Sequence, residues 1–478
     1  MWYRTTHDEF EYMTRLSQGI DQLLSVTMVK MERICLNYVN RSRKFILTSD
    51  DKQNAFERQY NHVYVSRLQA LKSRILDALR KEIGEEVKYK QLEDLEMFEK
   101  AFVIGTITKR ISMRPSVLKE IAEEELIIPE DYNDDDEVIS SASNRDFLEF
   151  EDEKQIVKLE GDIKLDGVAT GCTVGLYGSQ VKSDVFNVEK VIWPTPCPQN
   201  PWPTKKTGGI VAFLSGLELT NNAVDNASIT TGFGLMSRWL NCELSSTCDS
   251  ASSLACRIDR LVVLGESIAL DQAHEFTSSV HYLNLSYKEA ASNVETIALL
   301  DELLSSISTR VKLDLVPGFG DPCPQQLPQQ PIHRACLPRS SASGAALTLA
   351  TNPYEFSLAG FDILATSGRA VSDLRRLSSV NSSCDLMELI LRWQHIAPTC
   401  PDTVDGFPFE NRDPLIMNET FPHVMVVGNQ PCSESRWFEN SCGQRCLMIA
   451  VPRFSQTQLL VLLDLDTMNV LYKHFSAA

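Results

Sequence analysis

Residues 421–431 read FPHVMVVGNQP. The short apolar run at residues 424–427 predicts a buried strand, which passes directly into Gly428 and a polar loop. In a sheet covered by helices, ligands and catalytic groups sit at the carboxyl ends of the strands. The side chains of Asn429 and Pro431 therefore bear directly on whether this protein is an enzyme.

Strands of the same kind recur on both sides of this stretch. These strands are nearly continuously apolar, as is expected where helices cover both faces of a sheet, so residues 210–478 are predicted to form an α/β domain. The predicted strands span residues 210–214, 260–264, 312–316, 346–350, 361–365, 424–427, 447–451 and 459–465, and the predicted helices span 233–240 and 288–308.

Upstream of residue 193 the apolar spacing changes from one segment to the next. A long helix is predicted over residues 54–82, and a short one over 116–125. Short strands are predicted at residues 102–108, 155–159, 173–177 and 185–192, with glycine turns between them. Short antiparallel strands with one inserted helix are typical of a small oligonucleotide-binding (OB) barrel, which we place at residues 45–192.

Two further segments complete the organisation. Residues 13–39 carry apolar side chains at helical spacing, which predicts a helical extension over residues 1–44 that packs on its own domain or binds a partner helix. Residues 193–209, WPTPCPQNPWPTKKTGG, contain five prolines and are predicted to be an extended linker. The predicted fold is therefore α+β and multi-domain, with an OB barrel followed by the α/β domain.

Composition excludes several classes of protein. The 478 residues exceed what a single core usually holds, and 43% apolar with 23% charged residues is ordinary for a soluble globular chain. The longest apolar runs are too short to cross a bilayer, and the first residues lack the apolar core of a signal peptide. The thirteen cysteines include no Cys-x-x-Cys pair, so we expect reduced thiols rather than a zinc site.

The net charge of −18 is concentrated in one stretch. Between Glu120 and Glu153 there are fifteen acidic residues and one basic residue, which leaves about −4 for the rest of the chain. Residues 129–153 are predicted to be an acidic loop between barrel strands, with too few apolar groups to fold alone. Strong binding to DNA normally needs a basic patch, so we expect contact with DNA only indirectly, through partners.

Four strand ends form candidate site loops, at residues 214–219 (LSGLEL), 263–269 (VLGESIA), 316–322 (VPGFGDP) and 426–431 (VVGNQP). Their order and spacing resemble the calcineurin-like metallophosphoesterases. That family carries Asp-x-His, Gly-Asp, Gly-Asn-His-Asp and Gly-His-x-His at these places, and the resemblance implies a phosphoesterase-like α/β sandwich over residues 210–478. Its chemistry needs two metal ions held by carboxylates, imidazoles and an Asn.

The chain departs from that pattern at almost every ligand position. These positions carry Gly216, Glu218, Glu266, Phe319, Gly320, Asp321, Asn429 and Pro431, and only Asp321 keeps the family's residue. Glycine, phenylalanine and proline side chains offer no ligand atom. We therefore expect no catalytic residue, no cofactor-binding residue and no metal ligand at these loops.

Three carboxylates remain at the loops, on Glu218, Glu266 and Asp321. Hard cations accept all-oxygen shells, so a residual divalent-ion site is one interpretation. The other is that these are ordinary acidic loop residues, which the absence of histidines favours.

More specific motifs narrow the family. The chain resembles the small, B-type subunits of eukaryotic replicative DNA polymerases over residues 45–478, and most closely those of the delta type. The motifs are FERQYNHVYVSRL (56–68), RPSVLKEIAEE (114–124), DPCPQQLPQQPIH (321–333), NPYEF (352–356), ATSGRAVSDL (365–374), PTCPDTVDGFPF (398–409), DPLI (413–416) with PHVMVVGN (422–429), and VPRFSQT (451–457).

This resemblance implies a nuclear, non-catalytic accessory subunit that supports DNA replication and repair synthesis. Its implied partners are the C-terminal metal-binding module of the polymerase delta catalytic subunit and a third delta subunit. No association with a membrane is implied. Two alternatives stay open: a divergent metallophosphoesterase or nuclease, and the B-subunit of another B-family polymerase. For the barrel, protein binding is favoured over stacking on single-stranded DNA, because its strands offer few aromatic side chains.

Overall fold

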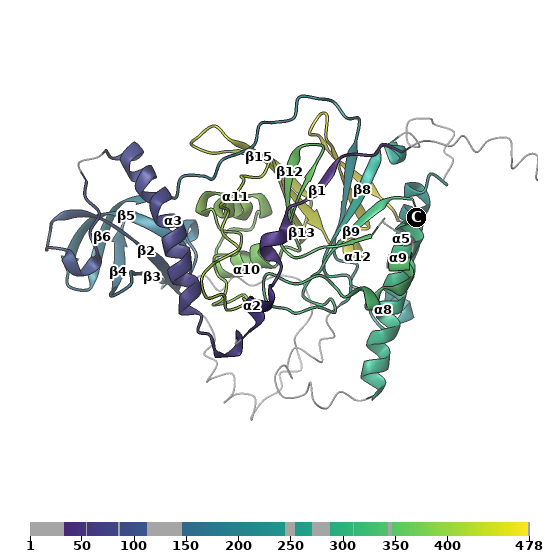
Figure 1. The fold of residues 1–478 in the computed structure, drawn as a ribbon, viewed down its shortest axis with the longest axis horizontal. Helices are drawn as coiled ribbons and strands as arrows, with labels where there is room; N and C mark the ends of the chain where they lie inside the picture. The colour runs from purple at the N-terminus through teal and green to yellow at the C-terminus, as the bar shows by residue number, and fades with distance from the viewer. Residues whose placement is uncertain are drawn as a thin grey trace, which may run out of the picture.

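The structure is a computed structural model that describes residues 33–53, 55–84, 87–111, 146–243, 254–269, 287–308, 310–342 and 347–476. A small barrel lies at one end of the molecule and a larger α/β domain at the other (Figure 1). Helix α3 (Asn61–Glu82) lies between them. Within the described residues, no helix is long and apolar enough to cross a membrane.

Five strands form the barrel. They close in the order β2-β3-β4-β6-β5, and their bounds are β2 (Lys100–Arg110), β3 (Phe147–Glu151), β4 (Ile156–Gly161), β5 (Thr173–Lys182) and β6 (Val185–Ile192). Inward-facing side chains such as Ile107, Phe150 and Phe186 are fully buried. The predicted barrel is confirmed.

Helix α3 is an amphipathic helix that packs against the outside of the barrel. Leu71, Ile75 and Leu79 recur at a spacing of four and are buried against Phe102 and Ile104 of β2. This spacing places the three side chains on one face of the helix. The predicted helix over residues 54–82 is confirmed, although the α-helical part begins at residue 61.

The larger domain contains two six-stranded sheets. The first sheet has the order β1-β11-β12-β13-β15-β14 and comprises β1 (Tyr38–Asn40), β11 (Tyr354–Leu358), β12 (Phe361–Thr366), β13 (Val424–Gln430), β15 (Arg445–Pro452) and β14 (Glu434–Glu439). The second has the order β10-β9-β8-β7-β16-β17 and comprises β10 (Leu347–Leu349), β9 (Lys312–Val316), β8 (Ile258–Leu264), β7 (Ile210–Leu214), β16 (Leu459–Asp464) and β17 (Val470–His474).

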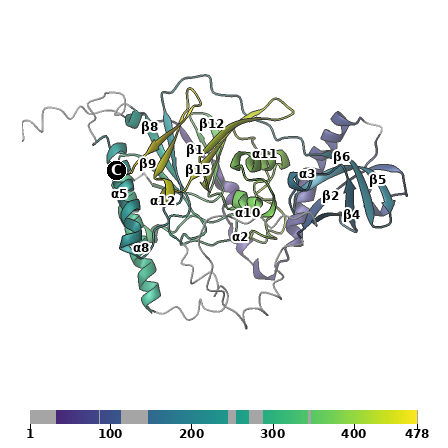
Figure 2. The same ribbon diagram turned by 180° about the vertical axis from the view of Figure 1, so that it is seen from behind.

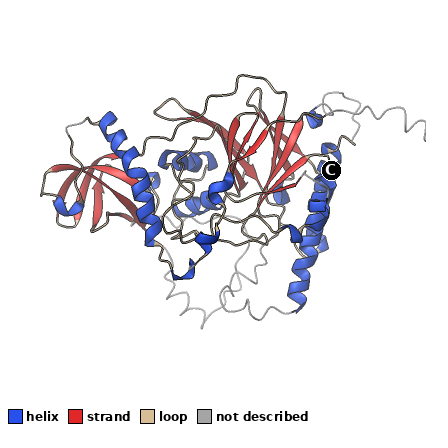
Figure 3. Cartoon of the chain, in the orientation of Figure 1, coloured by secondary structure: helices blue, strands red, loops and turns tan. Residues whose placement is uncertain are grey.

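The sheets and helices stack in four layers (Figures 2 and 3). Helices α5 (Ala223–Leu240) and α8 (Tyr287–Ser308) cover the second sheet. Helices α10 (Arg369–Leu377) and α11 (Ser383–Trp393) cover the first. The two sheets share one core between them, so both faces of the central strands are buried. That is why these strands are mostly apolar, and every strand predicted after residue 209 is present.

The prediction of a helix over residues 13–39 is wrong at its end. Residues 1–32 lie outside the described residues, but residues 33–37 are not helical and β1 pairs antiparallel with β11. The end of the predicted helical extension (1–44) is therefore an edge strand of the α/β domain. Sheet pairing with a distant segment has overridden the local helical pattern.

The predicted acidic loop, residues 129–153, is also wrong at its end. Residues 147–151 form β3, in which Leu148 and Phe150 point into the barrel while Glu149 and Glu151 point outward. This alternation is typical of a half-buried strand, and the density of acidic residues masked it. Residues 129–145 and the predicted helix at 116–125 lie outside the described residues.

The proline-rich segment 193–209 contains no helix or strand, in keeping with an extended connection. It lies against the α/β domain. The Trp202 ring is 4.6 Å from the His423 ring and 5.6 Å from the Trp437 ring, measured between centroids. Gln199 and Asn200 add hydrogen bonds to the same domain, which fixes the path of the chain between barrel and sandwich.

Candidate functional site

The four candidate loops meet at one edge of the sandwich. Strands β7, β8 and β9 are parallel, as are β12, β13 and β15, so their carboxyl ends gather there. The loop backbones approach so closely that glycine is required. A Cβ atom on Gly318 would lie 2.2 Å from the backbone nitrogen of Glu266. Gly216 adopts φ +60°, a conformation that favours glycine.

Asn429 ties the two sheets together. Its Nδ2 donates hydrogen bonds to the carbonyl oxygens of Leu264 (2.9 Å) and Ser367 (2.8 Å), at the ends of strands in different sheets. Its backbone N–H donates to Ser215 Oγ at 3.0 Å. Strand β13 runs through Gln430, so residues 428–430 continue the strand and the predicted loop there is wrong. Asn429 is thus a structural link within the sandwich.

Glu266 clamps the third loop. One carboxylate oxygen accepts the N–H of Phe319 at 2.8 Å and the other accepts the N–H of Gly320 at 3.1 Å. Burial raises the pKa of Glu266, against the effect of these two donors. Both oxygens are therefore engaged by the protein's own backbone.

The Asp321 carboxylate is likewise bonded to backbone N–H groups. Its carboxylate accepts backbone N–H groups of Gly318 (2.7 Å), Ser267 (2.9 Å) and Ile268 (3.2 Å), and the residue is 4% exposed. Burial, together with the negative charge of Glu266, raises the pKa of Asp321 to about 7. The three donors oppose this shift without cancelling it.

Of the remaining positions, Glu218 alone carries a carboxylate, and this group also has partners within the protein. Glu218 accepts a hydrogen bond from the Ser455 hydroxyl and lies 3.4 Å from Arg453 Nε. The Arg369 guanidinium lies over the Phe319 ring, 4.3 Å from its centroid. Pro431 is exposed just beyond β13.

The structure thus brings the three carboxylates close to one another but occupies each with groups of the protein itself. Among the described residues, no group of three or more His, Cys, Asp or Glu side chains is arranged to hold a metal ion. These hydrogen bonds stabilise the conformation of the loops. Sequence reasoning missed Ser215 and Ser367, because a serine near a strand end carries no signal of its own.

A second cluster, which the sequence did not single out, joins barrel and sandwich. Arg67 of α3 is buried, with Nε 2.8 Å from Asp413 Oδ2, and it donates further hydrogen bonds to three carbonyl oxygens, of Gly171, Pro398 and Cys400. His395 Nε2 also lies 2.8 Å from the same carboxylate. Burial opposes ionisation, yet His395 and Arg67 hold the pKa of Asp413 well below its usual range. The joint is built from contacts that neither domain makes alone.

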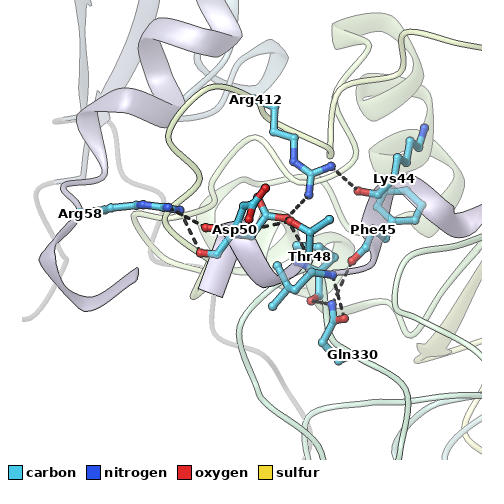
Figure 4. Close-up of polar contacts among 10 residues, drawn as sticks. Lys44, Phe45, Thr48, Asp50, Arg58, Gln330 and Arg412 are labelled. Atoms are coloured by element: carbon cyan, nitrogen blue, oxygen red, sulfur yellow. Dashed lines mark hydrogen bonds and ion pairs between the residues drawn. The ribbon is translucent and has the colours of Figure 1, made fainter. Parts of the chain in front are cut away.

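The segment that precedes α3 is fastened to the sandwich as well (Figure 4). Arg412 donates to the Lys44 carbonyl (3.2 Å) and to Asp51 Oδ2 (2.6 Å). The Gln330 side chain donates to the Phe45 carbonyl at 2.9 Å and accepts the N–H of Leu47 at 3.0 Å. The chain therefore enters α3 from a fixed position on the α/β domain.

Comparison with known proteins defines the class. Residues 59–191 match the family described as the OB-fold domain of the DNA polymerase delta subunit. Residues 211–436 match the family described as the B subunits of DNA polymerases alpha and epsilon. The two matches divide the chain where the fold does, between the barrel and the α/β domain. They define a B-type polymerase subunit with an OB fold before its α/β domain.

Curated relatives specify the type. A probable DNA polymerase delta small subunit from Caenorhabditis elegans is 40% identical over 450 residues, covering 92% of this chain and 97% of that protein. DNA polymerase delta subunit 2 from Drosophila melanogaster is 31% identical over 453 residues, covering 93% and 98%. The DNA polymerase delta small subunit from Saccharomyces cerevisiae is 30% identical over 494 residues, covering 94% and 95%. The chain belongs to the family of DNA polymerase delta small subunits.

Proposed function

We propose that this chain is a non-catalytic accessory subunit of DNA polymerase delta that acts as a scaffold in DNA replication and repair synthesis. The observation that carries the proposal is how the polar side chains are bonded at the edge of the sandwich where the four candidate loops meet. Glu266 and Asp321 direct their carboxylate oxygens, and Asn429 directs its Nδ2, at the backbone of the surrounding loops. A catalytic phosphoesterase would instead direct such groups at metal ions and substrate.

The α/β domain is, in this proposal, a calcineurin-like phosphoesterase sandwich that has lost its metal ligands. Four parallel-strand ends at one edge, between two sheets with helices outside, support that assignment. The altered positions are Gly216, Glu218, Glu266, Phe319, Gly320, Asp321, Asn429 and Pro431. The tight backbone packing at Gly318 and Gly216 supports a retained loop geometry after the ligands changed.

The proposed partners are the C-terminal metal-binding module of the polymerase delta catalytic subunit and a third delta subunit. The buried joint around Arg67 and Asp413 supports a scaffold role, because it holds barrel and sandwich in one fixed arrangement for partners to bind. A net charge of −18 argues against independent binding to DNA, so contact with DNA is proposed only through the assembled polymerase. Because its relatives are subunits of a DNA polymerase, we also propose that the protein acts in the nucleus.

Co-purification tests this function. The full chain, co-expressed with the C-terminal module of the catalytic subunit, should elute with it at equal stoichiometry in size exclusion at physiological salt. A folded chain that elutes alone, while its own melting transition is intact, would contradict the scaffold proposal. A chain that elutes alone and hydrolyses phosphodiesters with Mn²⁺ would favour a divergent phosphoesterase.

A further inference from the structure

Two cysteines outside the strand-end loops face each other at the far end of the second sheet. Cys242 follows the carboxyl end of α5, and Cys256 lies in the helical turn at residues 254–256, just before β8. Their Sγ atoms are 3.0 Å apart. A disulfide bond is about 2.05 Å long, so an approach of about 1 Å separates this contact from a covalent bond.

The backbone holds both thiols in place. Cys242 adopts φ +60°, and its N–H donates to the Trp239 carbonyl at 2.9 Å, which turns the chain at the end of α5. The N–H of Arg257 donates to the Leu254 carbonyl at 3.1 Å and fixes the turn that carries Cys256. The pair is therefore set by two anchored turns, one on each flank of the connection between α5 and β8.

The same two turns also bind the Arg33 side chain, and we call the carbonyl groups of Leu240, Ala255 and Ile258 the seat of Arg33. Its guanidinium donates to the carbonyl oxygens of Ala255 (3.0 Å), Ile258 (3.1 Å) and Leu240, and Nη2 lies 3.8 Å from Cys242 Sγ. Arg33 immediately precedes the residues that lead into β1. Any bond between the two cysteines would therefore fix the carbonyl groups that hold the amino-terminal part of the described chain.

We propose that Cys242 and Cys256 form an oxidant-responsive thiol pair, in which a peroxide converts two thiols to a disulfide that locks the seat of Arg33. The peroxide oxidises one thiol to a sulfenic acid and is reduced to water. The second thiol then attacks the sulfenic sulfur, and the new S–S bond forms as a second water leaves. The two cysteines lose two electrons and two protons in total, which the peroxide accepts.

The surroundings of Cys256 lower the reactivity of its thiol at neutral pH. Burial and the neighbouring Cys242 raise the pKa of Cys256 to about 11, although the Arg33 guanidinium acts in the opposite direction. Thiols react with peroxides as thiolates, so the reaction of Cys256 at neutral pH is slow and accelerates as pH rises. This behaviour suits a chain in a reducing compartment, where the pair would respond only to sustained oxidant.

Proteolysis and mass spectrometry on the full chain test the pairing directly. Cleavage after Arg238, Glu243, Asp249 and Arg257 places Cys242, Cys248 and Cys256 on three separate fragments. After treatment of the folded protein with hydrogen peroxide and alkylation of the remaining thiols, we expect fragments 239–243 and 250–257 to be joined. The fragment with Cys248, a residue outside the described part of the chain, should carry the alkyl label, and dithiothreitol should reverse the link.

Matched variants exclude other origins of the link. Cys256→Ser should abolish it, whereas Cys248→Ser and the exposed-cysteine control Cys442→Ser should keep it. A link from Cys242 to Cys248, or oxidation of Cys242 and Cys256 to separate sulfinic acids, would overturn the pairing. Limited trypsin digestion tests the lock: cleavage after Arg33 should slow on oxidation of the wild type and not of Cys256→Ser. Equal rates before and after oxidation of the wild type would overturn the lock.

Discussion

Arg67 Nε lies 2.8 Å from Asp413 Oδ2, with the two side chains 1% and 2% exposed. One residue comes from the helix that packs on the barrel and the other from a loop of the sandwich, so this ion pair joins the two domains directly. His395 and three backbone carbonyl groups complete the cluster. Because every charge in it has a partner, the cluster specifies one arrangement of the domains.

The first prediction concerns this pair. Arg67→Met should lower the free energy of unfolding by about 3–5 kcal/mol, because it leaves the Asp413 carboxylate buried with only part of its compensation. Chemical denaturation followed by circular dichroism measures the change. Arg80→Met is the matched control, since its ion pair with Asp77 is exposed and should change stability by about 0.5 kcal/mol or less. Equal effects from both variants would contradict the role given to the joint.

The second prediction concerns Asn429. Asn429→His restores a residue type typical of phosphoesterases, but we expect no phosphodiester hydrolysis because Gly216, Phe319 and Pro431 still supply no ligand. The variant should lose about 1–3 kcal/mol of unfolding free energy, since an imidazole cannot reproduce both hydrogen bonds to Leu264 and Ser367. Thermal melting measures the loss of stability, with Asn469→His as the exposed control. An unchanged melting temperature for Asn429→His would argue against a stabilising role of these two hydrogen bonds.

The third prediction concerns pH. Asp321 has a pKa of about 7 in the folded protein, against an ordinary aspartate value of about 3.9. Between these values the folded state binds a proton that the unfolded state has released. The free energy of unfolding should therefore fall as pH rises through this window, by up to about 1.4 kcal/mol per pH unit, and level off above it.

Asp321→Asn isolates that contribution from other titrating groups. The stability of the wild type relative to this variant should decline as pH rises from about 4 to about 7. Asp77→Asn, at an exposed aspartate, is the control for the loss of one surface carboxylate. Urea denaturation across the pH series supplies the measurement. A flat difference for Asp321→Asn would show that this carboxylate is not perturbed as described.

The fourth prediction concerns the acidic stretch. Deletion of residues 129–150 removes most of β3, including Leu148 and Phe150, and should abolish cooperative unfolding of the barrel. Deletion of residues 129–143 keeps β3 and removes a segment with six acidic residues and few apolar ones, so the melting temperature should stay close to that of the wild type. Differential scanning calorimetry compares the two. Similar melting of both deletions would show that β3 is not needed to close the barrel.

Much of the sandwich could be predicted because its central strands are apolar on both faces. The strand Ile210–Leu214, for example, is apolar at every position, so its own sequence is enough to predict it. The edge strand Tyr38–Asn40 could not be predicted, because only its pairing with β11, far along the chain, makes it a strand. Strand β3 was obscured by charge, since its outward residues Glu149 and Glu151 look like part of the acidic stretch.

The candidate site could also be predicted only in part. Parallel strands end at one edge, so Glu218, Glu266 and Asp321 could be expected to lie near one another, and their charges interact in the structure. Their hydrogen-bonding partners could not be anticipated, because these are mostly backbone N–H groups whose positions depend on three loops at once. Arg67 was missed for a similar reason: a single arginine on a helix gives no sign that it is buried between domains.

The most direct test of the central claim is hydrolysis of bis(4-nitrophenyl) phosphate by the purified full chain with saturating Mn²⁺. We expect no turnover above the rate of a buffer blank, with or without the catalytic subunit's C-terminal module. Turnover that requires Mn²⁺ and disappears in Glu266→Gln would contradict this expectation. In that case the carboxylates at the strand ends, which we place against backbone N–H groups, would hold a working metal site.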